Sequence, residues 1–489
     1  MSIRRAILLS SALLVLCGCF GSIEQLKRDL RSERLSRLQA WRNERAGKNE
    51  EMQTLTGPLS LENAILTSIG NSRDIQIALQ EREKADSKVV EAYAQAMPRV
   101  ELVGNYTRMD QAPSMGPGAN GYADNYALGA AVTQPLYRGG SIGAGVRAAK
   151  VYTVLVDEQL RGSFQNVIYA VRRGYYDTCL AIDLQLASAE AVKVAERHLE
   201  DVRKQFAAGT VSAYDVLSAE VELKNLVAQD VQNQNAVQVS LTNLYNLMGV
   251  SQESAVTLTD TLAYRPFKDA KMEDAVDLAY LQQTDILQSD LNILLQREAL
   301  VVAKSGYFPT LDAFFNPQLA TPDAHDITDN VWAGSWSAGL NLKYVLFEGF
   351  ATVARERQAQ ASLRQSELQR TNAEQRVLLQ VRQSILNLQY ADRFVQSQQA
   401  NVQQAEEALR LAELGFREGV RKEVEVADAR RSLISARANR AQAYYNHEVA
   451  RLQYEQATGT IEPPDAEQMR PPEPAAGRPA PATPAPKTP

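Results

Sequence analysis

Three charged residues in the last fifth of the chain are spaced so that a helix would place them on one side. Arg421 and Glu425 are four residues apart, and Asp428 follows three residues later, which are the separations at which helical side chains meet. On a solvated helix each such pair contributes only about 0.2 to 0.5 kcal/mol. Taken alone, the spacing therefore favours ordinary solvated charges near a helix end over a functional charged site.

Motifs that indicate catalysis are absent from the 489-residue sequence. It has no Gly-Lys-Ser or Gly-Lys-Thr phosphate loop, no His-Glu-x-x-His and no nucleophile elbow. The glycine-rich residues 140–145 follow a strand-like run and lack the spacing of a nucleotide loop, so they indicate a turn. The three histidines are far apart and the formal charge is only -6. We therefore expect no enzyme, no metal, no resident cofactor and no nucleic-acid partner.

The N-terminus carries a secretory signal. Two arginines precede an apolar run over residues 6–16, which is too short to span a membrane as a helix. The run ends in Leu-Cys-Gly-Cys at residues 16–19, a tetrapeptide that resembles the lipobox of bacterial lipoproteins. The resemblance implies that residues 1–18 are removed and that Cys19 carries a covalent lipid such as palmitate. A plain signal peptide cleaved nearby is the alternative.

Residues 351–414 form a stretch of 64 residues without Gly or Pro. As one helix it would be about 96 Å long, at about 1.5 Å per residue, which no compact domain could bury. Apolar and small residues recur there at alternating spacings of three and four, as in a coiled-coil seam. The seam consists of Leu388, Ala391, Val395, Gln398, Val402, Ala405, Leu409 and Ala412. By itself the pattern also fits a lone dimeric coiled coil.

Several segments show the alternation of a β-strand. After Pro98, apolar residues recur at every second position through Tyr106, and residues 126–137 form a second strand-like run. In residues 332–343 one face is apolar and the other small or polar. A barrel strand with lipid on one side and water on the other needs this pattern over about 9 to 11 residues. A soluble sheet would show it too, but the secretory signal favours a membrane.

The whole pattern occurs twice. Segments at the first helix, the strand start, the strand-to-helix corner, the turn and the last helix end recur 211 or 210 positions later. The pairs are residues 61–64 with 272–275, Pro98 with Pro309, Gly139 with Gly349, Gly209 with Gly419, and Gly249 with Gly459. We therefore predict a tandem duplication of helix, strand, strand, long helix, turn and helix, with only two copies of a long period.

The duplication suggests six parts. The segment before the first repeat is polar and rich in Arg and Glu, and ten of the nineteen prolines follow the second repeat. The parts are a lipoprotein signal peptide at 1–18, an acylated leader at 19–58, the first repeat at 59–250, a linker at 251–271, the second repeat at 272–460 and a disordered Pro- and Ala-rich tail at 461–489.

In this order, behind a lipobox, the duplicated elements resemble a TolC-type outer-membrane efflux channel over roughly residues 59–459. The resemblance implies a mainly α-helical chain with membrane β-strands. In a homotrimer, four strands from each subunit would form a twelve-stranded β-barrel, and the long coiled-coil helices would form a periplasmic α-helical barrel. The protein would lie in the bacterial outer membrane, held by its lipid and its barrel, and extend into the periplasm.

The resemblance also implies a gate at the periplasmic tip, where the family has a Tyr, an Arg and two acidic residues on the second turn. The matching residues are Phe416, Arg421, Glu425 and Asp428, with Tyr214 and Asp215 at the corresponding positions of the first turn. Phe416 lacks the hydroxyl group of a tyrosine and with it a hydrogen bond. Around a three-fold axis the acidic residues would form rings that favour cations, and Arg421 would pair with a carboxylate of a neighbouring helix and hold the tip shut.

The function implied by the resemblance is a passive exit duct that works with a periplasmic adaptor and an inner-membrane pump. Gly209 and Gly419 would lie in the turns that contact the adaptor, and Gly139 and Gly349 at the corners between strand and helix. A structural coiled-coil lipoprotein that spaces the outer membrane from the cell wall is the alternative, and the adaptor itself is a third. Two amphipathic strand pairs favour the duct, because neither alternative needs them.

Overall fold

The structure is a computed structural model that describes residue 28 and residues 31–39, 54–111, 122–267, 271–323, 325, 329–418 and 420–461. It has two compact units, one of residues 1–56 and 250–255, the other of residues 57–249 and 256–489. In the first unit, residues 31–39 are helical and exposed. The second unit holds both repeats. None of the described helices combines the length and the apolar character that a membrane-spanning helix requires.

The two repeats contain the same elements in the same order. The first has α3 (Leu61–Asn71), α4 (Arg73–Ala94), β2 (Arg99–Arg108), β3 (Asp124–Arg138), α5 (Ser141–Ala207) and α6 (Ala213–Met248). The second has α7 (Met272–Gln282), α8 (Thr284–Lys304), the 3-10 turn η1 (Ser305–Tyr307), β5 (Thr310–Thr321), β6 (Ala333–Lys343), α9 (Ala351–Arg417) and α10 (Glu423–Thr458). Helices α5 and α9 each have 67 residues, and α6 and α10 each have 36. The predicted duplication is confirmed.

The ends of the two repeats also pack alike. Gly249 follows α6 with a φ of 66°, and Gly459 follows α10 with a φ of 72°. A Cβ atom on Gly249 would lie 3.0 Å from Asn71, the last residue of α3, and one on Gly459 would lie 2.8 Å from Gln282, the last residue of α7. Glycine is therefore needed at both positions, for the left-handed backbone and for the close approach.

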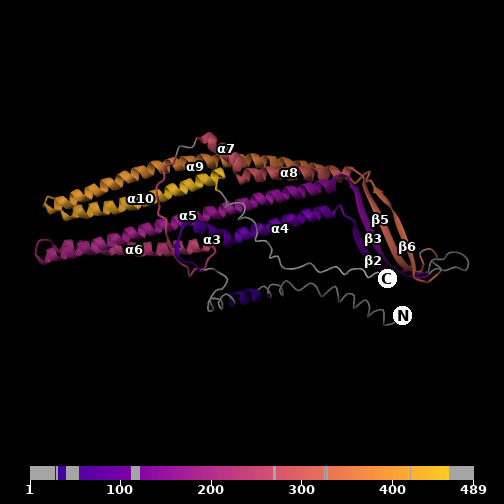
Figure 1. Ribbon diagram of the computed structural model, residues 1–489, viewed down its shortest axis with the longest axis horizontal. Coiled ribbons are helices and arrows are strands. Elements are labelled where there is room, and N and C mark those ends of the chain that lie inside the picture. Colours follow the sequence, from indigo (N-terminus) through magenta and orange to yellow (C-terminus); the bar gives the residue numbers. More distant parts are fainter. Residues whose placement is uncertain are drawn as a thin grey trace, which may run out of the picture. The chain divides into compact units, whose positions relative to one another are not determined.

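The long helix predicted over residues 351–414 is confirmed as most of α9, which at about 1.5 Å per residue is about 100 Å long. Its seam packs on α10: Leu388 and Val395 are fully buried, and Val402 contacts Leu433 and Ala436. Helices α5 and α6 pair in the same way. Each repeat thus forms a helical hairpin whose turn lies at the end opposite the sheet (Figure 1).

The repeat predicted from the sequence has a single helix before its first strand, and this prediction is wrong at Ser72. There the backbone is extended, with φ −64° and ψ 122°, and the chain divides into α3 and α4. The Ser72 side chain accepts a hydrogen bond from the Ile75 amide at 3.4 Å, which caps α4. The second repeat has the same break at Gln283. A single extended residue leaves no trace in the helical periodicity.

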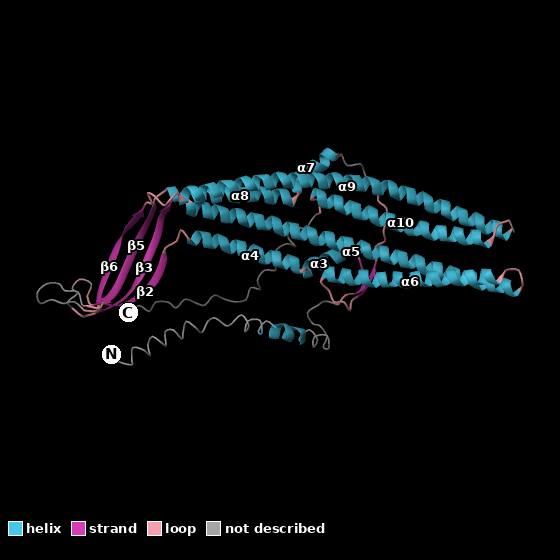
Figure 2. Cartoon of the chain, turned by 180° about the vertical axis from the view of Figure 1, so that it is seen from behind, coloured by secondary structure: helices cyan, strands magenta, loops and turns pink. Residues whose placement is uncertain are grey.

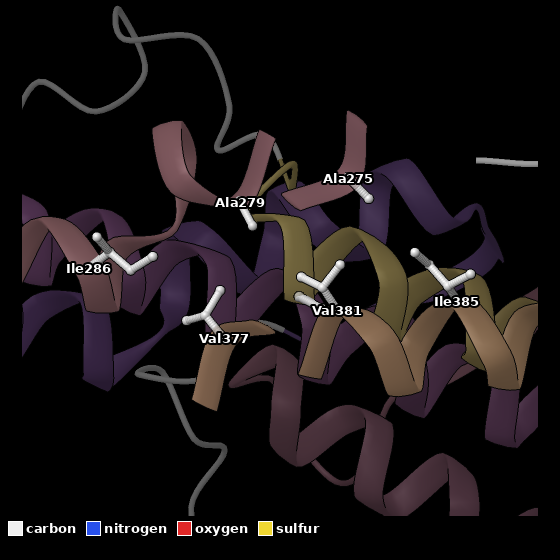
Figure 3. Packing of buried hydrophobic residues seen from close by; sticks show 7 residues of the cluster. Ala275, Ala279, Ile286, Val377, Val381 and Ile385 are labelled. Atoms are coloured by element: carbon white, nitrogen blue, oxygen red, sulfur yellow. The ribbon is translucent and has the colours of Figure 1, made fainter. Parts of the chain in front are cut away.

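The break lets α7 pack separately on the long helix of its repeat. Ala275 and Ala279 of α7 lie over Val377 and Val381 of α9, and Ile286 of α8 completes the cluster (Figure 3). The small alanine side chains allow the α7 backbone to approach α9 closely.

Four strands form one antiparallel sheet in the order β2-β3-β5-β6. The sheet lies at one end of the long helices (Figure 2). The first repeat supplies β2 and β3, the second supplies β5 and β6, and the pair β3–β5 joins the repeats. The outer strands β2 and β6 each have one edge that no described strand pairs with.

A second, two-stranded sheet lies partly within the predicted linker and was not predicted. In it β4 (Ala255–Leu258) pairs with β1 (Thr56–Leu59). Just beyond these strands, the Tyr175 hydroxyl group of α5 lies 3.0 Å from the Leu59 carbonyl oxygen and 2.9 Å from Asp260 Oδ2. Strands of four residues are too short to show an alternation in the sequence.

Candidate functional site

One face of the four-stranded sheet is apolar across all its strands. Val132 of β3 lies opposite Val100 of β2 and Phe315 of β5, and Phe315 lies opposite Ala338 of β6. Since residues two apart share a face, each row extends along its strand. The apolar face comprises Val100, Leu102, Gly104 and Tyr106 of β2, Tyr126, Leu128, Ala130 and Val132 of β3, Leu311, Ala313, Phe315, Pro317 and Leu319 of β5, and Gly334, Trp336, Ala338, Leu340 and Leu342 of β6.

This apolar face is uncovered in the described part of the chain. Leu102 is 81% exposed and Trp336 is 71% exposed. The opposite face carries small and polar residues, among them Asn105, Ser335 and Asn341. A sheet with lipid against one face and water against the other has this division. The register therefore turns the alternation within single strands into one continuous surface that suits a membrane.

Aromatic side chains lie at the end of the sheet away from the helices. Tyr106 and Tyr126 stack with their ring centroids 4.9 Å apart, and the Tyr106 hydroxyl group donates a hydrogen bond to Asp124 Oδ1 at 2.9 Å. Trp332, which is 60% exposed, precedes β6 at the same end. Aromatic residues with a polar group are typical of the boundary between membrane and water, so these residues mark one limit of the apolar face.

Left-handed backbone turns the chain from the sheet into each long helix. Gly139 and Gly140 have φ values of 61° and 86° before α5, and Gly349 and Phe350 have values of 63° and 64° before α9. A Cβ atom on Gly139 would lie 2.6 Å from the Ser305 carbonyl oxygen, whereas one on Gly349 would meet no described atom within 4 Å. The first corner is therefore packed and the second is open.

The turn of the first hairpin is closed by its own residues. Gly209 has a φ of 78°. The Ser212 amide and hydroxyl groups donate hydrogen bonds to Asp215 Oδ2 at 2.9 and 2.7 Å, and Ser212 Oγ accepts one from the Asp215 amide at 3.3 Å. These bonds from Ser212 lower the pKa of Asp215. Asp215 thus serves in a capping box, while Tyr214 is 75% exposed.

In the turn of the second hairpin, Arg421 and Glu425 lie close together, as their spacing predicts. Arg421 Nη1 is 3.6 Å from Glu425 Oε2, and Glu425 Oε1 accepts a hydrogen bond from the Lys422 amide at 3.2 Å. The Arg421 side chain packs over Gly415, where a Cβ atom would lie 2.9 Å from it. The interaction is thus local to one turn of the chain.

Asp428 pairs with a different arginine. Its Oδ1 atom lies 2.7 Å from Arg431 Nη2, and Arg431 Nε lies 3.6 Å from Glu222 Oε1 on α6. Arg431 therefore connects the second hairpin to the first near their turns. Arg431 and Glu222 were not among the residues predicted from the sequence. The spacing of Asp428 and Arg431 is visible in the sequence, but the approach of Glu222 depends on the packing of helices from different repeats.

Farther from the turns, partly buried contacts join the hairpins. Arg172 of α5 lies 2.5 Å from Glu455 of α10. The Tyr445 hydroxyl group donates a hydrogen bond to Asp177 Oδ1 at 2.5 Å, and burial together with this bond raises the pKa of Tyr445 to about 12. Exposed ion pairs such as that of Arg431 contribute less than buried hydrogen-bonded groups. The hairpins are therefore held firmly at mid-length and weakly near the turns.

Of the remaining predicted residues, some are described by the structure and some are not. Phe416 is half-buried at the end of α9. Gly419 and Cys19 lie outside the described residues. Within the described ranges no group of three or more His, Cys, Asp and Glu side chains is arranged to hold a metal ion.

Fold and site together define a class: a chain that supplies strands to a membrane sheet and fixes long helical hairpins to one end of it. The family model described as "Outer membrane efflux protein" matches residues 65–250 and 275–460, one match in each repeat. The chain belongs to the outer membrane efflux protein family, which confirms the resemblance seen in the sequence.

Individual relatives agree with this assignment. The outer membrane protein TolC of Vibrio cholerae serotype O1 is 26% identical over 80% of this chain and 88% of its own length. TolC of Escherichia coli strain K12 is 23% identical over 80% of both chains. Among solved structures, the Vibrio cholerae outer membrane protein VceC has a TM-score of 0.69 at 17% identity and covers 82% of this chain and 96% of that one. The Campylobacter jejuni CmeC channel has the same TM-score and identity and covers 82% and 85%. These structures support the fold.

Proposed function

We propose that the protein is an outer-membrane exit duct that carries material through the periplasm and the outer membrane. The observation that carries this proposal is the union of two features in one chain. One is a sheet whose apolar face continues through four strands, which suits a lipid-embedded barrel. The other is a pair of hairpins built on helices of 67 residues, long enough for a tunnel of about 100 Å. A coiled-coil spacer would not need the sheet.

The sheet also bears on the number of copies. Four strands cannot close a barrel, and open strand edges are not tolerated in lipid. Since β2 and β6 are antiparallel, β6 of one copy can pair with β2 of the next in the same alternation. Two copies would give an eight-stranded barrel, and side chains fill the interior of a barrel of that size. Three copies would give a twelve-stranded barrel with an open lumen. We therefore propose a homotrimer.

The duplication supports this arrangement. Within the chain, the corner at Gly139 packs on Ser305 and Phe308. The position equivalent to Gly139 in the second repeat is Gly349, 210 residues later. The positions equivalent to Ser305 and Phe308 in the first repeat are residues 94 and 97, 211 residues earlier. The equivalent contact therefore joins Gly349 to residues 94 and 97 of a second copy. Gly349 is open in the single chain, and Met97 is 59% exposed. The second corner thus has the space that a neighbouring copy would fill.

The long helices carry matching surfaces. Within the chain α5 packs on α10, so the equivalent contact between copies joins α9 to α6. Both helices have exposed apolar residues, as contact surfaces do. These are Leu368, Leu379, Leu386 and Tyr390 on α9, and Leu217, Val221, Val231 and Val239 on α6.

A duct needs partners that supply energy, because it is a passive channel and not an enzyme. Relatives include the proteases secretion protein PrtF of Dickeya chrysanthemi and the probable efflux pump outer membrane protein TtgC of Pseudomonas putida. By analogy, this chain works with a periplasmic adaptor and an inner-membrane pump. The turns at Gly209 and Gly419 are the proposed adaptor contacts, since they lie at the far ends of the hairpins.

The lipid anchor and the gate belong to the same proposal. Cys19 would carry the lipid, and labelling with palmitate should be lost in Cys19→Ala. The gate would comprise the predicted residues of both turns together with the ion pair that the sequence did not reveal. Its members are Tyr214, Asp215, Phe416, Arg421, Glu425 and Asp428, with Arg431 and Glu222. Arg421 and Arg431 partly neutralise the acidic residues beside them, which weakens any acidic ring.

Cross-linking combined with conductance tests the duct. Val132 pairs with Phe315 within the chain. The equivalent positions in the other repeat are Leu342, 210 residues after Val132, and Gly104, 211 residues before Phe315. We therefore predict that Leu342 lies beside Gly104 of the next copy. In the double variant Gly104→Cys and Leu342→Cys, mild oxidation should join purified chains into covalent trimers that conduct in planar lipid bilayers. Each single variant is the control and should stay uncrosslinked. A protein that remains monomeric and does not conduct would overturn the proposal.

A further inference from the structure

His447 lies in the middle of α10 and is fully buried. Its side chain is 0% exposed, and neither ring nitrogen has a hydrogen-bond partner among the described residues. Buried polar atoms without partners are uncommon in folded proteins. Burial lowers the pKa of His447 from its ordinary value of 6.5. The imidazole is therefore neutral at pH 7.

The nearest acceptor, Asp392 of α9, is already occupied. The Tyr264 hydroxyl group donates a hydrogen bond to Asp392 Oδ1 at 2.6 Å, and Gln396 Nε2 donates one to Oδ2 at 3.1 Å. His447 Nε2 lies 3.8 Å from Oδ1, beyond hydrogen-bonding distance. The Tyr264 ring meets the His447 ring edge to face, with centroids 5.1 Å apart. Tyr264 thus shields the imidazole and binds the group that would otherwise satisfy it.

Tyr264 belongs to an irregular segment between the repeats, residues 259–267, which we name the strap. Phe267 of the strap packs on Tyr454 of α10, with ring centroids 5.4 Å apart, and Leu262 is 8% exposed. The strap therefore covers one stretch of the second hairpin. The positions of the first hairpin equivalent to Asp392 and His447, 210 residues earlier, are Ile182 and Val237. Only the second hairpin has a titratable pair at these positions.

The charged groups around His447 act in opposite directions. Asp392 favours the protonated imidazole, whereas Arg451, one turn away on α10, opposes it. Tyr264 is neutral, because burial raises the pKa of its hydroxyl group. On the side of α5, Arg172 is paired with Glu455.

The neighbouring Glu448 is 7% exposed, and burial raises its pKa although Arg451, Arg265 and Arg172 favour its charged form. Acid therefore stabilises the buried state of Glu448 and destabilises that of His447. A variant at His447 is needed to separate the two effects.

We propose that protonation of His447 releases the strap from the second hairpin. An imidazolium needs acceptors or water, and the carboxylate beside His447 in the described part of the chain is Asp392, whose nearer oxygen already accepts the Tyr264 hydrogen bond. The proton consequently binds more tightly to the state in which the strap has lifted and water reaches the ring, so acid shifts the population toward that state. Residues 261–267 of the strap have no helical or strand hydrogen bonds, whereas Thr259 and Asp260 at its start are bonded to Leu59 and Tyr175. Lifting the strap therefore breaks few backbone hydrogen bonds.

The direction of the pH dependence follows from the neutral ring being the stable buried form. The free energy that favours the covered state over the released state is greatest above about pH 6.5, the ordinary imidazole pKa. It decreases as the pH falls below that value. Each unit by which burial lowers the pKa changes the equilibrium by about tenfold. A loosened strap would free the hairpin that carries the second turn. That last consequence rests on the proposed function, whereas release of the strap does not.

Hydrogen exchange of the full-length protein in detergent tests the release. Protection factors of amides in residues 259–267, corrected for intrinsic rates, should fall between about pH 7.5 and about pH 5, most of all at the hydrogen-bonded amides of Thr259 and Asp260. In His447→Phe, which keeps an aromatic ring but cannot bind a proton, they should stay constant. His325→Gln is the control, because the His325 side chain is 74% exposed. In this variant the protection factors should fall as they do in the wild type. Constant protection in the wild type, or an equal fall in His447→Phe, would overturn the proposal.

Tyr264→Phe provides an arm that does not depend on folding of the His447 variant. It keeps the ring over His447 but frees Asp392 to accept a hydrogen bond from the protonated imidazole, so the fall in protection on acidification should be smaller than in the wild type. A fall as large as that of the wild type would contradict the role of this contact. None of these measurements requires conductance, so failure here and failure of the proposed duct are distinguishable.

Discussion

Arg431 Nε lies 3.6 Å from Glu222 Oε1, and this pair joins helices from the two repeats close to their turns. The same arginine lies 2.7 Å from Asp428. The Arg431 side chain is 60% exposed, whereas the Arg172 and Glu455 side chains at mid-length are only 19% and 22% exposed. We therefore expect the tips of the hairpins to separate more readily than their middle sections.

Arg431→Gln should make the tip easier to open. An exposed pair contributes about 0.2 to 1 kcal/mol, so three pairs in a trimer contribute about 0.6 to 3 kcal/mol to the closed state. We expect a higher mean conductance in planar bilayers. Arg437→Gln is the matched control, because Arg437 pairs with Glu406 within one hairpin at 3.0 Å. The exchange Glu222→Arg with Arg431→Glu should restore part of the difference, because it re-forms the link between the helices but sets a second carboxylate beside Asp428. A conductance no lower than that of Arg431→Gln would exclude the pair as a link.

Lysine at neighbouring positions of β6 should distinguish the two faces of the sheet. Ala338 lies on the apolar face and Ser337 on the opposite face. In a barrel, Lys at the middle of the lipid face costs about 2 to 4 kcal/mol, whereas the lumen tolerates it. Ala338→Lys should therefore lower the temperature at which the folded form is lost on heated gels, and Ser337→Lys should leave it almost unchanged. The reverse order would mean that the faces are assigned wrongly.

The two corner glycines should respond differently to alanine. Both variants incur about 1 to 2 kcal/mol for a left-handed alanine, but only Gly139→Ala places a Cβ atom 2.6 Å from the Ser305 carbonyl oxygen. Gly139→Ala should lower the unfolding temperature of the protomer more. Gly349→Ala should mainly reduce the trimeric fraction, because its corner would be filled by a neighbouring copy. Size-exclusion chromatography with light scattering separates these effects, and an unchanged trimeric fraction would count against the proposed contact.

Acid should loosen the start of α6 through Asp215. Hydrogen bonds from Ser212 lower the pKa of Asp215 from its ordinary value of 3.8, so the ionised form stabilises the folded capping box. This stabilisation is complete above that value and is lost as the pH falls below it. Amides at the start of α6 should lose protection from hydrogen exchange below about pH 4. Asp215→Asn should show less protection at neutral pH and little further loss, and a loss equal to that of the wild type would assign the effect to another group.

Much of the fold follows from local patterns. The absence of Gly and Pro from residues 351–414 predicts α9, and the spacing of its seam predicts which residues are buried against α10. The alternation in residues 332–343 predicts β6 together with its apolar face. The repeated glycines predict the duplication, because the backbone conformation they permit recurs at equivalent places, as at Gly249 and Gly459.

What the sequence could not reveal depends on contacts between distant segments. The break at Ser72 involves one extended residue, and strand β4 has only four residues. The approach of Arg431 to Glu222 is set by how the hairpins pack. The burial of His447 depends on Tyr264, which is far away in the sequence and lies in a segment without periodicity.

The equal lengths of α5 and α9 have a consequence for docking. Both helices leave the same end of the sheet and have 67 residues, and both return through helices of 36 residues. The two turns therefore end at the same depth, and three copies would present six turns as a level rim. A partner that approaches end-on could engage every turn with one repeated contact, whereas one extra helical turn in α9 alone would leave alternate sites about 5 Å out of reach.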